Sequence, residues 1–304
     1  MKTPLLELTH GPAANLLPKG AQVWMKLELF QQAGSFKTRG VLLAIDAMSS
    51  AERRAGVIAA SGGNHAFAVA TACAREGIDA LIVMPEAADA RTVARCDDLG
   101  ATIRRTPGAR TDLALLDQLA QETGRTKLHP FDTPHMILGA ATCGYEITNN
   151  LPELDAMIVP VGGGGLIAGI SRTFKQFCPM TQIIGVEPEG AASMTRSLEA
   201  GQPLQLDTVD TCAVSLAASR AEPLTFAAAA EHVDRMVTLA DGTMIDAMRA
   251  LSDSLGLMVE PACAASFAAL TGPLAAEMAG KKVGIIACGS NLSRAGYARI
   301  IGEG

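Results

Sequence analysis

Lys37 is the residue whose position in this sequence most favours chemistry. It lies in residues 34–40 (GSFKTRG), after a segment over 24–29 with the pattern of a strand. Gly34 and Ser35 predict a turn with Ser35 as N-cap, and apolar residues at helical spacing predict a helix over 36–48. Lys37 would then lie in the first helical turn, where the helix dipole disfavours a positive charge. Such a lysine has a lowered pKa and can act as a nucleophilic amine.

Most lysines are solvated surface charges, so this interpretation needs support from the rest of the chain. The natural partner of a nucleophilic amine is an aldehyde, and the common aldehyde cofactor is pyridoxal phosphate. The other glycine-rich and polar loops of the sequence test that possibility.

A second polar stretch joins a predicted strand over 57–60 to a predicted helix over 65–76. It consists of Ser61, Gly62, Gly63, Asn64 and His65. Loops at the carboxyl ends of parallel strands bind ligands in open α/β folds, and backbone amides at a helix start can hold a substrate carboxylate. A tight turn with an asparagine cap is the alternative, and this stretch alone does not decide between them.

A third stretch is a run of glycines between a predicted strand over 156–161 and a predicted helix from Leu166. The run consists of Gly162, Gly163, Gly164 and Gly165. Glycines let backbone amides approach a phosphate at a helix N-terminus. The same residues also fit a loose dinucleotide pattern, G-x-G-x-x-A, with Glu187 as the ribose acid. The run alone therefore leaves a nicotinamide-dependent oxidoreductase open.

The order of the motifs carries a family resemblance. Residues 34–40, 61–65, 162–165 and 288–291 (CGSN) resemble the motifs of fold type II pyridoxal-phosphate enzymes, in the branch of serine/threonine dehydratases and serine racemases. The resemblance covers nearly the whole chain. It implies two open, twisted, mainly parallel sheets flanked by helices, similar to the tryptophan synthase β fold.

The resemblance also implies roles for single residues. Lys37, next to Phe36, would bind the cofactor and then take the Cα proton of the substrate. Asn64 would contact the cofactor 3′-oxygen, and Cys288 would face the pyridine nitrogen as a neutral partner. The cofactor phosphate would lie on the glycine run, and the substrate carboxylate would be bound by Ser61, Gly63 and His65.

Three departures from the family pattern affect the expected chemistry. Racemases of this branch carry a serine acid/base where this sequence has Gly62, which favours elimination over racemisation. Relatives bind a divalent cation through a glutamate, a carbonyl and an aspartate. Glu187 and Ala191 match the first two, but Ser193 replaces the aspartate with a poorer ligand. Residues 139–142 (GAAT) replace the usual GQGT, which is expected to change the substrate pocket.

Strands and helices alternate along the chain, which predicts βαβ units and parallel sheets with helices on both faces. The predicted strands are nearly all apolar, as in strands that are buried on both sides. With the family resemblance, this pattern predicts a large cofactor-binding domain from 1–45 and 138–304, with a small α/β domain, 46–137, inserted in it.

The amino-acid composition and net charge indicate which classes of partner and which compartment to expect. The chain has 304 residues, 49% hydrophobic and 18% charged, and a net charge of −6, which disfavours nucleic acid and anionic membranes as partners. Seven cysteines without a Cys-x-x-Cys pair predict reduced thiols in a cytoplasmic protein. The N-terminus has no signal-peptide pattern, and no apolar run is long enough to span a membrane. Relatives are commonly dimers, so a homodimer is expected from the resemblance.

The leading hypothesis is a lyase that converts an L-β-hydroxy amino acid, such as serine or threonine, into a 2-oxo acid and ammonia. An amino-acid racemase of the same fold is the first alternative. A nicotinamide-dependent oxidoreductase and a protein that binds pyridoxal phosphate or an amino acid without turnover are the others. The sequence leaves the substrate side chain open among serine, threonine, 3-hydroxyaspartate and phenylserine.

Overall fold

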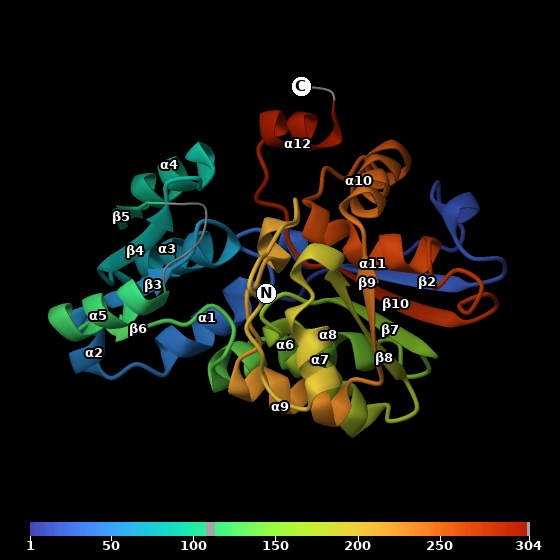
Figure 1. Ribbon diagram of the computed structural model, residues 1–304, viewed down its shortest axis with the longest axis horizontal. Helices are drawn as coiled ribbons and strands as arrows, with labels where there is room; N and C mark the ends of the chain where they lie inside the picture. The colour runs from blue at the N-terminus through green and yellow to red at the C-terminus, as the bar shows by residue number, and fades with distance from the viewer. Residues whose placement is uncertain (108–112, 303–304) are drawn as a thin grey trace.

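Two β-sheets organise the chain in the computed structural model, which describes residues 1–107 and 113–302 (Figure 1). The larger sheet has the order β1-β2-β10-β7-β8-β9, and β1 pairs with β2 antiparallel while all other neighbours are parallel. Its strands are β1 (Leu5–Glu7), β2 (Gln22–Leu27), β10 (Lys282–Ala287), β7 (Ala156–Pro160), β8 (Gln182–Pro188) and β9 (Arg235–Leu239). The two-sheet, mainly parallel α/β fold expected from the sequence is confirmed.

The larger sheet is covered on both faces, as its apolar strands require. In Figure 1, α10 and α11 lie on one side of it and α6, α7 and α9 on the other. The helices of this part are α6 (Pro134–Thr148), α7 (Gly165–Phe177), α8 (Ser193–Ala200), α9 (Pro223–His232), α10 (Asp241–Leu255), α11 (Pro261–Thr271) and α12 (Arg294–Ile301). All five residues of β7 are buried, because side chains on both of its faces meet helices.

The smaller sheet is fully parallel, with the order β5-β4-β3-β6. Its strands are β5 (Thr102–Thr106), β4 (Ala80–Pro85), β3 (Val57–Ala60) and β6 (Thr126–Lys127), and its helices are α2 (Ser50–Ala55), α3 (Asn64–Glu76), α4 (Ala90–Asp98) and α5 (Leu113–Thr123). Alternate residues of β3 point to opposite faces. Val57 and Ala59 therefore join the core beneath α3 and α4, whereas Ile58 and Ala60 pack with Leu116 of α5.

Helix α1 (Lys37–Asp46) connects the two sheets. Its Val41 and Ile45 belong to the core of the smaller sheet, while Gly40 lies against α6 of the larger part. The contact with α6 is close, since a Cβ built on Gly139 would lie 2.3 Å from the backbone nitrogen of Gly40. Gly139 therefore serves helix packing. It matches the family pattern, so the expectation that the departures at 140 and 141 change the substrate pocket remains a prediction. The division into 1–45 plus 138–304 and 46–137 remains a prediction.

Local boundaries differ from the sequence prediction in a few places. Helix α1 begins at Lys37 with Phe36 as N-cap, so Ser35 is not the cap, and its buried hydroxyl has no hydrogen-bond partner among the described residues. The short strands β1, β6 and β9 were not predicted. The sequence pattern also predicts a helix over 112–122. The structure gives α5 as Leu113–Thr123, and Asp112 itself lies outside the described residues. No helix in the described ranges has the length and apolar character needed to cross a membrane.

Candidate active site

Three of the predicted motifs meet at one edge of the larger sheet. Strands β2, β10 and β7 are neighbours and run parallel, so their carboxyl ends lie side by side. Lys37 follows β2 through a short 3₁₀ turn, Cys288 follows β10, and the glycine run follows β7. The carboxyl edge of a parallel sheet is the usual ligand site of open α/β folds.

The lysine loop and the cysteine loop are joined by backbone hydrogen bonds. The amide of Phe36 donates to the carbonyl of Cys288 at 3.0 Å, and the amide of Ser290 donates to the carbonyl of Gly34 at 2.9 Å. The loops touch closely, because a Cβ built on Gly289 would lie 2.7 Å from the Cβ of Ser35. Lys37 and Cys288 are thereby held next to each other.

The Lys37 amine has the properties of a nucleophile. Its Nζ donates to the carbonyl of Pro130 and lies 5.0 Å from the centre of the Phe36 ring and 5.8 Å from that of Phe131. Burial lowers the pKa of Lys37 to about 8. The direction agrees with the sequence prediction, and its largest cause is desolvation of the charged form.

Asn64 connects the smaller sheet to the larger one. Its Nδ2 donates to Glu260 Oε1 at 2.6 Å and to Ser215 Oγ at 3.2 Å, and its Oδ1 accepts from Asn291 Nδ2 at 2.6 Å. The NH₂ group of the amide therefore faces Glu260 and its carbonyl faces Asn291. Burial raises the pKa of Glu260 to about 7, against the opposing effect of its hydrogen bonds.

Sequence reasoning missed Glu260 and Ser215. Glu260 precedes Pro261 at the start of α11, a pattern that indicates a helix start and nothing more. Ser215 lies in a short 3₁₀ turn, Val214–Leu216, without a local motif. Only a pairing of distant segments could have identified either residue.

The 61–65 loop leads into α3 with its backbone amides at the helix start. Ser61 Oγ accepts from the amide of Gly63 at 3.2 Å, which shapes the turn. The buried imidazole of His65 contacts the carbonyl of Leu128 through Nε2 at 3.0 Å. Burial lowers the pKa of His65 to about 3, so the ring is neutral near pH 7. A carboxylate at this loop would therefore be bound by amides, not by a histidinium.

The glycine run forms the start of α7. Gly164 is the N-cap, with φ at +83°, a conformation that favours glycine. A Cβ on Gly163 would lie 2.4 Å from the Phe131 ring, and one on Gly164 would lie 2.7 Å from Met194 Cε. The first amides of a helix have no intrahelical partner and favour an anion. The backbone here is thus shaped for a phosphate.

Cys288 is a buried thiol that stays protonated. A hydrogen bond with Cys263 and burial both raise its pKa well above the usual range, and Sγ contacts the carbonyl of Ala262 at 3.6 Å. The edge of the sheet therefore offers an amine poised to react, an anion site and a neutral thiol. These groups fit the aldehyde, the phosphate and an unprotonated pyridine nitrogen of pyridoxal phosphate.

The predicted cation site at Glu187 does not fit the geometry. The carboxylate is fully buried and accepts from the amides of Met194 and Thr195 at 2.8 Å each and from Thr195 Oγ1 at 2.6 Å. It therefore caps α8, and burial raises its pKa to about 7. Ala191 is buried in the preceding turn, and the described residues contain no group of three or more His, Cys, Asp or Glu placed to hold a metal ion.

The same capping removes the acid that a dinucleotide site would need for a ribose hydroxyl. Both oxygens of Glu187 are already used by α8, so they are not available to a nucleotide. The glycine run therefore has no free Glu187 carboxylate to bind a ribose hydroxyl, which the nicotinamide hypothesis requires.

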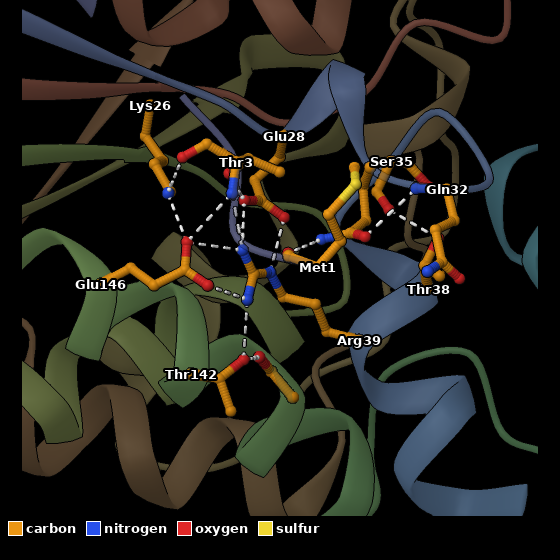
Figure 2. Close-up of polar contacts among 12 residues, drawn as sticks. Met1, Thr3, Lys26, Glu28, Gln32, Ser35, Thr38, Arg39, Thr142 and Glu146 are labelled. Carbon is orange, nitrogen blue, oxygen red and sulfur yellow. Dashed lines mark hydrogen bonds and ion pairs between the residues drawn. The ribbon is translucent and has the colours of Figure 1, made fainter. Parts of the chain in front are cut away.

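A buried ionic cluster holds the first turn of α1 (Figure 2). Arg39 donates to Glu28 Oε2 and to Glu146 Oε1, each at 2.7 Å. Lys26 donates to Glu146 and to the carbonyl of Thr3. Two cations thus balance two carboxylates. Their contacts join β2, α1, α6 and the N-terminal segment, and Arg39 lies only two residues after Lys37.

Comparison with known proteins agrees with this site. A family model described as pyridoxal-phosphate dependent enzyme matches residues 1–289. Phenylserine dehydratase of Ralstonia pickettii is 43% identical over 285 residues, which cover 94% of this chain and 87% of that protein. L-threonine ammonia-lyase of Thermotoga maritima is 38% identical over 287 residues, covering 94% and 71%.

Solved structures show the same fold. The processed form of threonine deaminase isoform 2 from Solanum lycopersicum superposes with a TM-score of 0.91 at 33% identity, covering 100% of this chain and 88% of that one. Maize serine racemase gives a TM-score of 0.88 at 32% identity, covering 97% and 90%. The chain belongs to the pyridoxal-phosphate dependent enzyme family, and its relatives are ammonia-lyases and racemases that act on amino acids. The resemblance found in the sequence is confirmed, and with it the cofactor.

Proposed function

We propose that this enzyme converts an L-β-hydroxy amino acid into a 2-oxo acid and ammonia. Pyridoxal phosphate, when bound, supplies the electron withdrawal that makes the Cα–H bond acidic. The observation that carries the proposal is the Lys37 amine, which has a pKa near 8 and lies at a sheet edge between an anion-binding glycine turn and a polar loop.

Each residue has a defined task in this proposal. Lys37 Nζ anchors the cofactor and later accepts the Cα proton. The first amides of α3, after Ser61 and Gly63, bind the substrate carboxylate, while the start of α7 binds the phosphate. Asn64 would keep its hydrogen bond to Glu260 and donate the N–H that contacts Ser215 to the cofactor 3′-oxygen. The neutral Cys288 thiol would leave the pyridine nitrogen unprotonated.

Gly62 supports elimination over racemisation. Racemisation needs an acid on the face of Cα opposite the lysine, and Gly62 provides no side chain there. The position is also closed, since a Cβ would lie 3.0 Å from Ala88 Cβ and 3.2 Å from Pro85 Cγ. His65 does not replace the missing acid, because its neutral ring already contacts Leu128. A positioned acid typically contributes about 10²–10⁴-fold, so racemisation should be minor.

The test incubates the purified holoenzyme with L-serine, L-threonine and L-threo-phenylserine. A coupled assay measures the 2-oxo acid, and chiral chromatography measures the D-amino acid. We expect 2-oxo acid to form much faster than D-enantiomer. Faster accumulation of D-amino acid would assign the protein to the racemases instead. The similarity to maize serine racemase is the reason for testing this alternative.

Two further proposals concern the protein as a whole. We infer a cytoplasmic enzyme from its reduced cysteines, and a homodimer from an exposed apolar surface on α6 and at the end of α7. That surface includes Leu138, Tyr145, Phe177 and Met180, and the Tyr145 and Phe177 rings lie edge to face at 5.8 Å. Sedimentation equilibrium should give twice the chain mass, and a monomer at micromolar concentration would contradict the homodimer.

A further inference from the structure

The ring of Phe131, called the aromatic wall below, lies beside the Lys37 amine. Phe131 lies in the segment before α6, and its ring packs against the glycine turn, where a Cβ on Gly163 would lie 2.4 Å from ring carbon Cγ. His129 meets the same ring edge to face at a centroid distance of 4.7 Å. Phe131 is half-buried, as is Asp132 after it.

The wall is within reach of the substrate side chain. The Phe131 ring centre is 5.8 Å from Lys37 Nζ, and Nζ must approach Cα closely to take its proton. Cβ is one bond from Cα, so a group on Cβ lies close enough to the amine to contact the same ring. The backbone of Phe131 is fixed as well, because its amide donates to His129 Nδ1 at 3.4 Å.

The charge around this space disfavours a second carboxylate on the substrate. Burial lowers the pKa of His129 to about 4, and its Nδ1 accepts amide hydrogens from Phe131 and Asp132, so the ring is neutral. His65 is neutral for the same reason. Asp132 is directed to α9, where its Oδ1 accepts from the amide of Thr225 at 2.8 Å. Two lysines act on His129: Lys37, which is buried at the site, and Lys127, which is paired with Asp117.

We propose that Phe131 is a specificity-determining residue that selects a β-hydroxy amino acid with an apolar, preferably aromatic, group on Cβ. This inference rests on the proposed dehydratase function and narrows its substrate class. Aromatic rings prefer offset or edge-to-face neighbours, and such pairs contribute beyond the area that they bury. A phenyl group on Cβ can stack on Phe131, and a methyl group covers less of the ring. A carboxylate finds only the reacting lysine and Lys127, whose charge is already paired with Asp117.

The experiment compares kcat/KM of the holoenzyme for L-threo-phenylserine, L-threonine, L-serine and 3-hydroxyaspartate. We expect phenylserine to exceed threonine by about tenfold or more, since even one methylene in an apolar pocket changes kcat/KM by roughly 10–200-fold. The 3-hydroxyaspartate should be the poorest. A second readout is independent of turnover: L-phenylalanine should perturb the visible absorption of the bound cofactor at lower concentration than L-alanine does.

Two variants and a control locate the effect. Phe131→Ala should reduce the phenylserine-to-threonine ratio about tenfold, and Phe131→Leu should reduce it less because it keeps an apolar wall. Phe30→Ala changes a phenylalanine with a 48% exposed side chain and should leave the ratio unchanged. Circular dichroism and cofactor absorption establish that each variant is folded and loaded.

The outcomes distinguish a wrong assignment of Phe131 from a wrong dehydratase function. If the enzyme dehydrates threonine or serine better than phenylserine, or if Phe131→Ala leaves both the ratio and L-phenylalanine binding unchanged, the assignment of Phe131 is wrong and the dehydratase function stands. If a folded holoenzyme releases no 2-oxo acid from any of the four substrates, the proposed function itself fails.

Discussion

At the scale of single residues, the reactivity of Lys37 depends on how much of its amine is unprotonated. With a pKa near 8, a substantial fraction is neutral at physiological pH, whereas an amine at the ordinary value of 10.5 is almost fully charged. Desolvation by the surrounding segments produces this shift, and the neutral form is the nucleophile.

The rate of cofactor attachment to the apoenzyme should therefore follow the free amine. We expect the rate to rise about tenfold per pH unit below 8 and to level off above it, because the protonated amine cannot attack an aldehyde. Stopped-flow absorbance measures this directly, with a model amine of pKa 10.5 as the control. Lys37→Ala should abolish attachment, and borohydride trapping of the pyridoxyl group on Lys26 would show that the wrong lysine has been assigned.

Gly62 is the second residue on which the chemistry depends. Gly62→Ser should not create an efficient racemase, because Pro85 and Ala88 occupy the space that a side chain needs. Overpacking of this kind typically costs about 1–3 kcal/mol of unfolding free energy. Chemical denaturation of the apoenzyme and chiral product analysis measure the two effects.

The matched steric control is Gly63→Ala, since a Cβ there would meet no described atom within 4 Å. Its unfolding free energy should stay close to that of the parent protein. Efficient D-amino acid formation by Gly62→Ser would contradict the steric argument.

At the scale of elements, the buried ionic cluster fixes α1 to β2 and α6 (Figure 2). Glu28 is fully buried and pairs with Arg39, which is 8% exposed. Such a pair adds little to stability relative to an apolar one, but removing one partner leaves an uncompensated charge in the interior.

Glu28→Ala should lower the unfolding free energy by about 3–5 kcal/mol, because Arg39 loses the fully buried one of its two carboxylate partners. The control is Glu277→Ala, which removes the exposed partner of Arg235 and should change stability by less than about 1 kcal/mol. Urea denaturation measures the unfolding free energies of both variants. Equal effects would mean that the buried cluster does not hold α1.

At the scale of the whole molecule, Asn64 is held by residues from the other sheet. Glu260 and Asn291 both belong to the larger part, while Asn64 begins α3 beside the smaller sheet. A second contact supports this junction, since Arg95 of α4 donates to Asn291 Oδ1 at 3.0 Å and stacks on Phe67. The Asn64 amide, which is proposed to contact the cofactor, is therefore positioned by the association of the two sheets.

Glu260→Ala should weaken cofactor binding about five- to tenfold, since one lost hydrogen bond is worth roughly 1 kcal/mol or slightly more. Glu260→Gln keeps an acceptor for the Asn64 amide and should bind the cofactor nearly as well as the parent protein. Absorption titration of the apoenzyme with pyridoxal phosphate gives both affinities. An unchanged affinity in Glu260→Ala would show that Glu260 does not position Asn64.

The sequence alone determined the α/β class, the cofactor and the loops that are predicted to bind it. These features are local: a glycine run before a helix, or a lysine after a Gly-Ser turn, is defined by a few consecutive residues and by backbone rules that hold in any fold. The strands β1 and β6 escaped prediction because two or three residues carry too little pattern. Strand β9 begins with the exposed Arg235 and is only partly buried, so it lacks the apolar run that identified the other strands.

Only the tertiary structure decided how the site is completed. The Lys37 amine meets the carbonyl of Pro130 across 93 positions, and Asn64 meets Glu260 across 196. Glu187, which matches a cation ligand of the relatives, caps α8 because the chain turns back onto it directly after β8. Burial lowers the pKa of Lys37 and keeps His65 and His129 neutral. Burial is a property of packed neighbours, which a local pattern does not contain.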